Sequence, residues 1–366
     1  MNLRIPGPTP LPPHVLEAMS QQMIDHRGPQ FEALFGDIIA WSKVFFETEG
    51  DVCLLTCSGT GGMEAAIVNT LSPGDKVLAV VIGSFGQRFA EIATAYGAQV
   101  TTLSYPLGWP ADPGGVAAAV RDAARSAEGA YAAVLLTQNE TSTGVTNDME
   151  ALCAAIHDAA GPDAPAPLIL VDGISGVPAI RLRTDEWGCD VVVSGSQKAW
   201  MAPPGAVLLT FSERAWAAYE RAKMPRFYLD IGQAKKYAAR NQTPATPNVS
   251  AIYGLHASLQ RMVAEGREAF QAHHAAIGEY ARGRAGELGL GIFAQPGYES
   301  NTVTAIKLGE GADASQVLKA LRDDYDIIVG SSKAPGVEMI RIGHLGHVSE
   351  EDLQAVFAAL KEILGH

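Results

Sequence analysis

The chain has 366 residues, of which 47% are hydrophobic and 18% are charged, and its formal net charge is −13 at pH 7. This composition is typical of a globular enzyme with a large core, so disordered and fibrous proteins are excluded. The acidic balance also argues against sequence-independent binding of nucleic acid, because such binding needs a basic face.

The sequence predicts no membrane attachment and a cytoplasmic location. The start, MNLRIPGPTPLPPHV, lacks the apolar core of a signal peptide, and no apolar run approaches the roughly 20 residues of a membrane span. The cysteines form no CxxC pair and lie in or beside apolar segments, so we expect them to be reduced: Cys53, Cys57, Cys153 and Cys189.

In chain order, a Pro-rich opening predicts an extended arm over 1–15, after which apolar strands alternate with helices. Strands are predicted at 53–58, 76–82, 99–105, 131–137, 168–173, 190–196 and 206–211, and helices at 61–71, 86–97, 114–127 and 148–160. Continuous apolar strands separated by helical periodicity indicate a mostly parallel, seven-stranded sheet flanked by helices. The expected fold class is therefore α/β.

The pattern changes after about residue 247, where long amphipathic helices replace the alternation. Two strands follow, in NTVTAIKL and VEMIRIG. We therefore expect an arm over 1–15, a large domain over 16–250 and a smaller α+β domain over 251–366.

Ligands bind at the carboxyl ends of the strands in an open parallel sheet, so the residues after each strand are the candidates for function. The stretch SGTGGMEAA (58–66) joins a strand to a helix, and its small residues and helix amides suit a phosphate. It is not a dinucleotide fingerprint, because Glu64 stands at the third glycine position of GxGxxG, and no GK[ST] of a Walker loop follows. By itself the stretch is a weak signal for a phosphate site, and a plain tight turn is the commoner explanation.

Three more strand ends carry polar residues: TQNETSTG (137–144), Asp172 in VDGISG and Lys198 in SGSQKAW. Singly, Asp172 could cap a turn, and Lys198 could reach solvent or an anion. Jointly, a phosphate cup, an acid, and a lysine 198 − 172 = 26 residues later are what a pyridoxal phosphate site needs. They would serve as phosphate anchor, partner of the ring nitrogen and Schiff-base amine.

At these residues the chain resembles the class V, fold-type I aminotransferases, most closely the alanine-glyoxylate and serine-glyoxylate aminotransferase group. Matching motifs follow one another over nearly the whole chain: PGPTPLPP, SGTGGMEAA, GSFGQRFAEI, ETSTGV, VDGISG, SGSQKAWMAPPG, FYLDI, TPATP and IRIGHLG. The resemblance implies an enzyme that moves an amino group from alanine or serine to a 2-oxo acid, glyoxylate or pyruvate, with ping-pong kinetics.

The resemblance also implies roles for single residues in binding the cofactor. Lys198 would hold it covalently, Asp172 would pair with its ring nitrogen, and Ile174 would pack on the ring. Phe85 would stack on the opposite face of the ring, and Thr141 would touch the ring edge. The phosphate contacts would come from Thr60, Gly61, Gly62 and Gln197.

The resemblance also implies residues that would bind the substrate or contact a second subunit. Arg341 would grip the substrate carboxylate as a bidentate fork, and Gly7 would lie close to the substrate. Thr246 would reach the phosphate of the neighbouring subunit, which implies a homodimer. Thr243 stands where close relatives carry a tyrosine, so a second contact across the interface is in doubt.

Other activities on this fold have to be weighed. A cysteine desulfurase needs a nucleophilic cysteine after the lysine, and here every cysteine precedes Lys198. A lyase or racemase that uses pyridoxal phosphate at the same site stays open, whereas a non-catalytic scaffold has no need of these residues together.

Two short histidine motifs have no assigned role. His344 and His347 form an HxxH that could suggest a metal, although no further ligands complete such a site, so no metal is expected. His26 and Arg27 could begin a helix or line the pocket.

Overall fold

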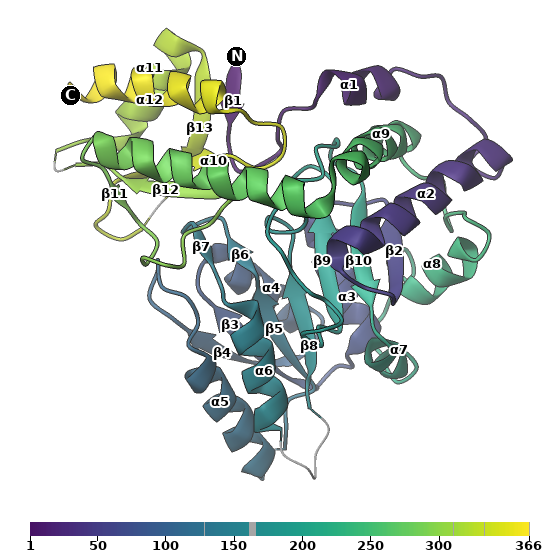
Figure 1. Ribbon diagram of the computed structural model, residues 1–366. Coiled ribbons are helices and arrows are strands. Elements are labelled where there is room, and N and C mark those ends of the chain that lie inside the picture. The colour runs from purple at the N-terminus through teal and green to yellow at the C-terminus, as the bar shows by residue number, and fades with distance from the viewer. Residues whose placement is uncertain (128, 161–165, 310, 333, 366) are drawn as a thin grey trace.

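The computed structural model describes residues 1–366 except 128, 161–165, 310, 333 and 366. Figure 1 shows a large sheet covered by helices and, beside it, a smaller sheet at which the amino-terminal strand and the last helix meet. Within the described residues, no helix has the length and apolar character needed to cross a membrane.

The large sheet has seven strands, as the sequence predicts, and only one of them runs against the others. Their spatial order is β2 (Asp51–Leu55), β10 (Val207–Phe211), β9 (Val191–Gly195), β8 (Leu168–Asp172), β5 (Ala133–Thr137), β3 (Lys76–Val81) and β4 (Gln99–Ser104). β10 is antiparallel to both of its neighbours, and all other pairs are parallel. Because helices cover both faces, six of the strands are buried along their whole length or nearly so.

Helices follow the strands where periodicity predicts them: α3 (Gly59–Thr70), α4 (Ser84–Ala95), α5 (Pro113–Arg125) and α6 (Met149–Ala159). The α3 and α4 helices share one hydrophobic core with α7 (Glu213–Tyr219) and α8 (Ile231–Ala238). The α5 and α6 helices share the core on the other face of the sheet with α2 (Pro29–Phe46). The sheet is thus the middle of three layers.

Two long helices, α9 (Val249–Glu265) and α10 (Arg267–Glu287), precede most strands of the smaller sheet in the chain. This sheet contains β11 (Gly291–Ile292), β12 (Val303–Lys307), β13 (Ile327–Ser331) and β14 (Met339–Gly343), and α10 packs on it with α11 (Ala314–Tyr325) and α12 (Glu350–Leu364). A two-stranded ribbon, β6 (Asn139–Glu140) and β7 (Val145–Thr146), extends from the end of β5.

The amino-terminal arm is only partly extended, contrary to the sequence prediction. Its first residues form β1 (Asn2–Arg4), which pairs in parallel with β13 of the smaller sheet. A short helix, α1 (Pro13–Met19), packs on α9. Between β1 and α1 the arm runs past the carboxyl edge of the large sheet. There the N–H of Thr9 donates to the carbonyl of Gln197 at 3.1 Å.

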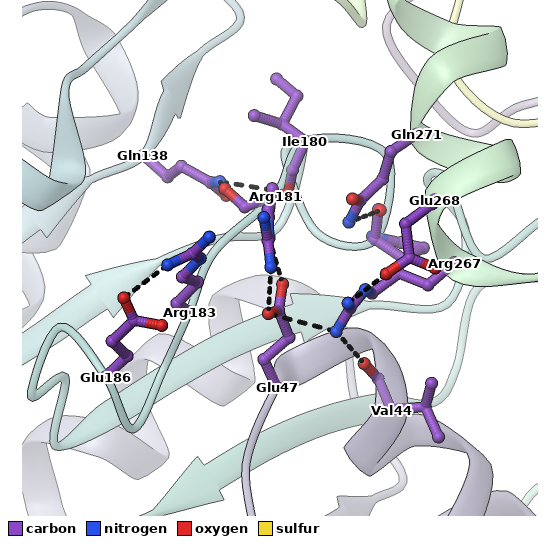
Figure 2. Close-up of polar contacts among 11 residues, drawn as sticks. Val44, Glu47, Gln138, Ile180, Arg181, Arg183, Glu186, Arg267, Glu268 and Gln271 are labelled. Carbon is purple, nitrogen blue, oxygen red and sulfur yellow. Dashed lines mark hydrogen bonds and ion pairs between the residues drawn. The ribbon is translucent and has the colours of Figure 1, made fainter.

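An ion-pair cluster links the end of α2 to the start of α10 (Figure 2). Arg181 donates from Nε and Nη2 to the carboxylate of Glu47 at 2.8 and 2.9 Å, and Arg267 reaches the same carboxylate at 3.1 Å. Gln138 supports this segment by donating to the carbonyls of Ile180 and Arg181. The cluster therefore fixes α10, which leads into the smaller sheet, against the large sheet.

Candidate active site

Asp172 and Lys198 lie at the same edge of the large sheet. Asp172 is the last residue of β8, and Lys198 lies on the turn that follows β9. The two strands are parallel neighbours in which Asp172 is opposite Val193, so both side chains belong to the carboxyl edge, where open α/β sheets bind ligands.

The amine of Lys198 is partly buried, and desolvation lowers its pKa to about 8. Asp172 acts in the opposite direction, while the nearby cations Arg341 and Arg88 reinforce the decrease. Nζ donates to the carbonyl of Pro6 in the arm. About a tenth of an amine with this pKa is neutral at pH 7, far more than of an ordinary lysine, and a Schiff base requires the neutral nucleophile.

Asp172 is 4% exposed, and desolvation raises its pKa to about 7. The N–H of Ile174 donates to Oδ1 at 3.0 Å, which favours the ionised form, as do Lys198 and Arg88, whereas Glu140 opposes it. A buried acid of this kind needs a cationic partner to be ionised. A protonated ring nitrogen would be such a partner.

The start of α3 offers free backbone donors. Ser58 is its N-cap, but no side chain caps the helix. Glycine here serves packing, because a Cβ on Gly62 would lie 2.5 Å from a methyl of Val193 and one on Gly59 would lie 2.7 Å from Ile174. The helix start is therefore fixed close to β9, with amides available for a phosphate.

Gln197 adds an unpartnered polar group to this edge of the sheet. Its Oε1 is buried and has no hydrogen-bond partner among the residues that the structure describes. Buried amide atoms in folded proteins are normally paired, and rotation of this amide would present its Nε2 donor to a phosphate that binds beside it. The unpartnered amide, the free amides of α3 and the buried acid together fit pyridoxal phosphate.

Glu140 is a site residue that the sequence analysis did not single out, although it lies in the ETSTG motif. Its buried carboxylate accepts from the N–H of Phe85 at 2.9 Å and of Gly86 at 3.2 Å. The other oxygen accepts from the N–H and hydroxyl of Ser142 at 3.0 and 2.6 Å. Glu140 thus fixes Phe85, on α4, relative to the segment that carries Thr141.

Arg341 lies on β14 and extends toward that same segment. Nη1 donates to the carbonyl of Thr141 at 2.9 Å, while Nε and Nη2 both donate to the carbonyl of Ser331. Burial lowers the pKa of Arg341, which Glu140 partly offsets, yet a guanidinium stays charged. Because Ser331 occupies the Nε edge, the remaining N–H groups of Nη1 and Nη2 are the ones available to a carboxylate.

Gly7 brings the arm against the lysine. Its φ is +113°, which L side chains rarely adopt, and a Cβ there would lie 2.6 Å from Nζ of Lys198. A side chain at residue 7 would therefore collide with the lysine itself.

Replacing Gly7 by alanine should lower kcat/KM at least about ten-fold, since the methyl group and the strained backbone displace the amine of Lys198. Steady-state kinetics would measure this loss, with far-ultraviolet circular dichroism to confirm that the fold persists. Gly283→Ala is the matched control, because a Cβ there would meet open space. Full activity of Gly7→Ala would contradict this placement of the arm.

No hydrogen bond among the described residues joins Thr246 to Lys198. Thr246 is exposed and makes no hydrogen bond within the described residues. Thr243 is buried, and its hydroxyl donates to the carbonyl of Ala245 at 2.8 Å. Arg27 donates to the carbonyls of Thr243 and Pro244, so Arg27 stabilises this segment rather than lining the pocket.

The HxxH motif forms no metal site. His344 is buried in the smaller sheet, 2.8 Å from the hydroxyl of Thr304, and desolvation lowers its pKa to about 3. His347 is exposed on the following segment. Among the residues that the structure describes, no three histidine, cysteine or acidic side chains are arranged to hold a metal ion.

A three-layered α/β fold with a lysine, a buried acid and free helix amides at its carboxyl edge defines a fold-type I pyridoxal phosphate enzyme. The family profile Aminotransferase class-V matches residues 1–355. The chain therefore belongs to the class-V aminotransferase family, whose members use pyridoxal phosphate.

Curated relatives cover nearly the whole chain but carry different names. A protein of Synechococcus sp. (strain PCC 6716) named soluble hydrogenase, small subunit, is 39% identical over 99% of this chain and 92% of its own. The L-aspartate–glyoxylate aminotransferase of Paracoccus denitrificans is 38% identical over 94% of this chain and 86% of its own. The serine–glyoxylate aminotransferase of Methylorubrum extorquens is 36% identical over 98% and 89%.

Solved structures agree with the observed fold. The structure of the alanine–glyoxylate aminotransferase of Nostoc sp. superposes with a TM-score of 0.92 and 29% identity, covering 99% of this chain and 95% of that one. The family profile and this structure both indicate an aminotransferase, so the expected fold class and activity are confirmed.

Proposed function

We propose that this aminotransferase moves the amino group of alanine or serine to glyoxylate, or to pyruvate. The observation that carries the chemistry is the pair formed by Lys198, with its lowered pKa, and the buried Asp172 on the neighbouring strand end. Bound pyridoxal phosphate supplies an electron sink for the negative charge that develops at the α-carbon of the amino acid.

The residues of the chain have separate tasks in this proposal. Lys198 holds the cofactor and, once an amino acid has displaced it, its free amine removes and returns the α-proton. Asp172 is held as a carboxylate by the cationic ring nitrogen and keeps that nitrogen protonated. Gln197, Thr60 and the amide of Gly61 hold the phosphate. Gly62 makes no such contact through its amide, because its N–H donates to the carbonyl of Ser58 at 3.1 Å, and instead lets the helix lie close to β9.

Further contacts orient the cofactor ring and the α-carboxylate of the substrate. Phe85 stacks on the ring, which Ile174 supports from the other face, and Thr141 contacts the ring edge. Arg341 binds the α-carboxylate, and Gly7 leaves room for the substrate beside the lysine. Because donor and acceptor use the same site in turn, the kinetics are ping-pong.

The acceptor is supported by the names of relatives. The Paracoccus, Methylorubrum and Nostoc enzymes are all named for glyoxylate, although their donors differ. A small 2-oxo acid needs a single carboxylate partner, which Arg341 provides. The family and these names do not favour the alternative of a lyase or racemase.

Replacing Arg341 by lysine should raise the KM for both the amino acid and glyoxylate about 10- to 100-fold, with a smaller effect on kcat. A lysine is a point charge and cannot give two parallel N–H bonds to a carboxylate. Steady-state kinetics with both substrates would measure this effect. An unchanged KM would show that another group binds the carboxylate.

Aspartate is a second candidate donor because of Arg88, whose side chain is exposed on α4. Its Cζ lies 4.9 Å from the centroid of Phe85, and its charge acts on both Asp172 and Lys198. Within the described residues Arg88 forms no ion pair, so its guanidinium is available to a second carboxylate.

A donor screen decides between these candidates. Alanine, serine and aspartate would be compared by kcat/KM with glyoxylate as acceptor, in the wild type and in Arg88→Gln. If aspartate is a donor, the variant should lose about ten-fold or more with aspartate and stay within about two-fold with alanine. If no small amino acid transfers its group to glyoxylate, the proposed acceptor is wrong.

The proposed assembly is a homodimer in which Thr246 contacts the phosphate held by the neighbouring subunit. Phe227 is 93% exposed and Tyr228 is 58% exposed, and an interface would cover such apolar side chains. Sedimentation equilibrium checks the expected mass. A cytoplasmic location, which the reduced cysteines favour, is proposed with it.

A further inference from the structure

A cavity of about 250 Å³ lies outside the active site, where the arm, the long helices and the segment after β14 meet. His14 of α1, Arg261 of α9 and His347 after β14 all line it. These residues come from three separate parts of the chain, and the function proposed above uses none of them.

Three basic side chains line this cavity: Arg261, which is charged, and His14 and His347, which are held largely neutral at pH 7. Burial lowers the pKa of His14, and the nearby Arg261 and His347 lower it further. Burial and the cations Arg4 and Arg261 also lower the pKa of His347, against the opposing effect of Asp352. Nε2 of His14 is buried and, among the described residues, has no hydrogen-bond partner. Three groups that repel one another as cations would be stabilised together by one anion.

The rest of the lining is mostly apolar. Pro12, Met201, Phe270 and Val348 form the walls. A bare inorganic anion would leave these walls uncovered, whereas a carboxylate on a short hydrocarbon body would match both parts of the lining. Since a cavity of about 150 Å³ holds benzene, a volume of about 250 Å³ accommodates a short-chain carboxylate with room to spare.

Other charged or titratable side chains line the cavity, and the acidic one, Glu265, reduces its net positive charge, but they do not occupy the space inside it. Glu265 lines it one helical turn after Arg261, and no ion pair joins these two side chains in the described part of the chain. The ring of His273 is fixed at the opposite wall, with Nε2 3.2 Å from the carbonyl of Val348.

The cavity lies directly behind the turn that carries the catalytic lysine. Met201 in its wall donates its N–H to the carbonyl of Lys198 at 3.0 Å. Gly346, which also lines the cavity, has a φ of +77°, and a Cβ there would lie 3.2 Å from the same carbonyl. A molecule in the cavity would therefore touch two residues that contact the backbone of Lys198.

We propose that this cavity is a binding site for a small organic carboxylate, separate from the substrate site. The carboxylate binds among His14, Arg261 and His347, and the hydrocarbon body lies against Met201 and Phe270. Met201 and Gly346 connect this site to the backbone of Lys198.

Butyrate is a suitable probe, and butyramide is its uncharged control. The holoenzyme labelled with ¹⁵N-histidine would be titrated with each compound while the side-chain resonances of His14 and His347 are followed by NMR. Butyrate should shift both resonances and raise the pKa of both rings, so its affinity should rise about ten-fold from about pH 8 to about pH 6. Butyramide should do neither.

Three variants separate this cavity from the substrate site. Arg261→Gln should weaken the histidine response to butyrate at least about ten-fold, and Glu265→Gln should strengthen it. Arg341→Gln, which alters the substrate clamp, should leave it unchanged. A response that disappears in Arg341→Gln and persists in Arg261→Gln would place butyrate in the substrate site and overturn the proposal, as would an equal response to butyramide.

Discussion

Replacing Lys198 by alanine should lower kcat for amino transfer at least about 10⁴-fold. The variant loses both the covalent attachment of the cofactor and the amine that carries the α-proton. The arm holds this amine in place, because Nζ donates to the carbonyl of Pro6 and lies against Gly7. Transfer from alanine to glyoxylate would be measured together with the absorbance of bound pyridoxal phosphate.

Lys236→Ala is the matched control for this variant, because Lys236 is exposed on α8. It should retain the activity of the wild type. If Lys198→Ala kept more than about 1% of wild-type kcat, the catalytic amine would have to be another group.

Asp172→Asn should lower kcat about 10²- to 10⁴-fold at full cofactor occupancy. An amide cannot stabilise a protonated ring nitrogen as a carboxylate does, so the cofactor withdraws electrons from the α-carbon less strongly. Cofactor content would be measured separately, because a weaker hold on the cofactor must be distinguished from slower chemistry. A variant with full occupancy and wild-type kcat would contradict the role of Asp172.

The same variant should change how the stability of the cofactor-free protein depends on pH. Burial raises the folded-state pKa of Asp172 to about 7, above its unfolded value. The stability tied to this group is therefore fully present at low pH and is lost as pH rises through about 7. Denaturant unfolding between about pH 4 and pH 8 should show a decline in the wild type that is reduced in Asp172→Asn.

Much of the large sheet follows from local patterns in the sequence. Except for the edge strand β4, each strand contains a short apolar run, and in several a polar or small residue marks its end, as at Asp172 and Gly195. The α2 helix carries a similar signal, because Pro29 occupies its first turn and Phe31, Phe35 and Ile38 repeat on its buried side. Because these residues precede the predicted alternation of strands and helices, which begins at residue 53, the sequence analysis predicts no element over Pro29–Phe46.

Contacts between distant segments could not be predicted from local patterns. The pairing of β1 with β13 and the hydrogen bond from Lys198 to Pro6 join opposite parts of the chain. Glu140 is one acidic residue among the polar residues after a strand, and its role depends on the approach of α4 to that strand's end. That this buried acid fixes the position of Phe85 therefore becomes visible only in three dimensions.

The most direct test is a visible spectrum of the purified holoenzyme, recorded before and after alanine or serine is added and again after glyoxylate. If the chain is an aminotransferase that acts through Lys198, the band of the lysine-bound cofactor should disappear with the amino acid and return with glyoxylate. A cofactor band that stays unchanged with every donor would contradict amino transfer, and the absence of any such band would contradict the cofactor site at Lys198.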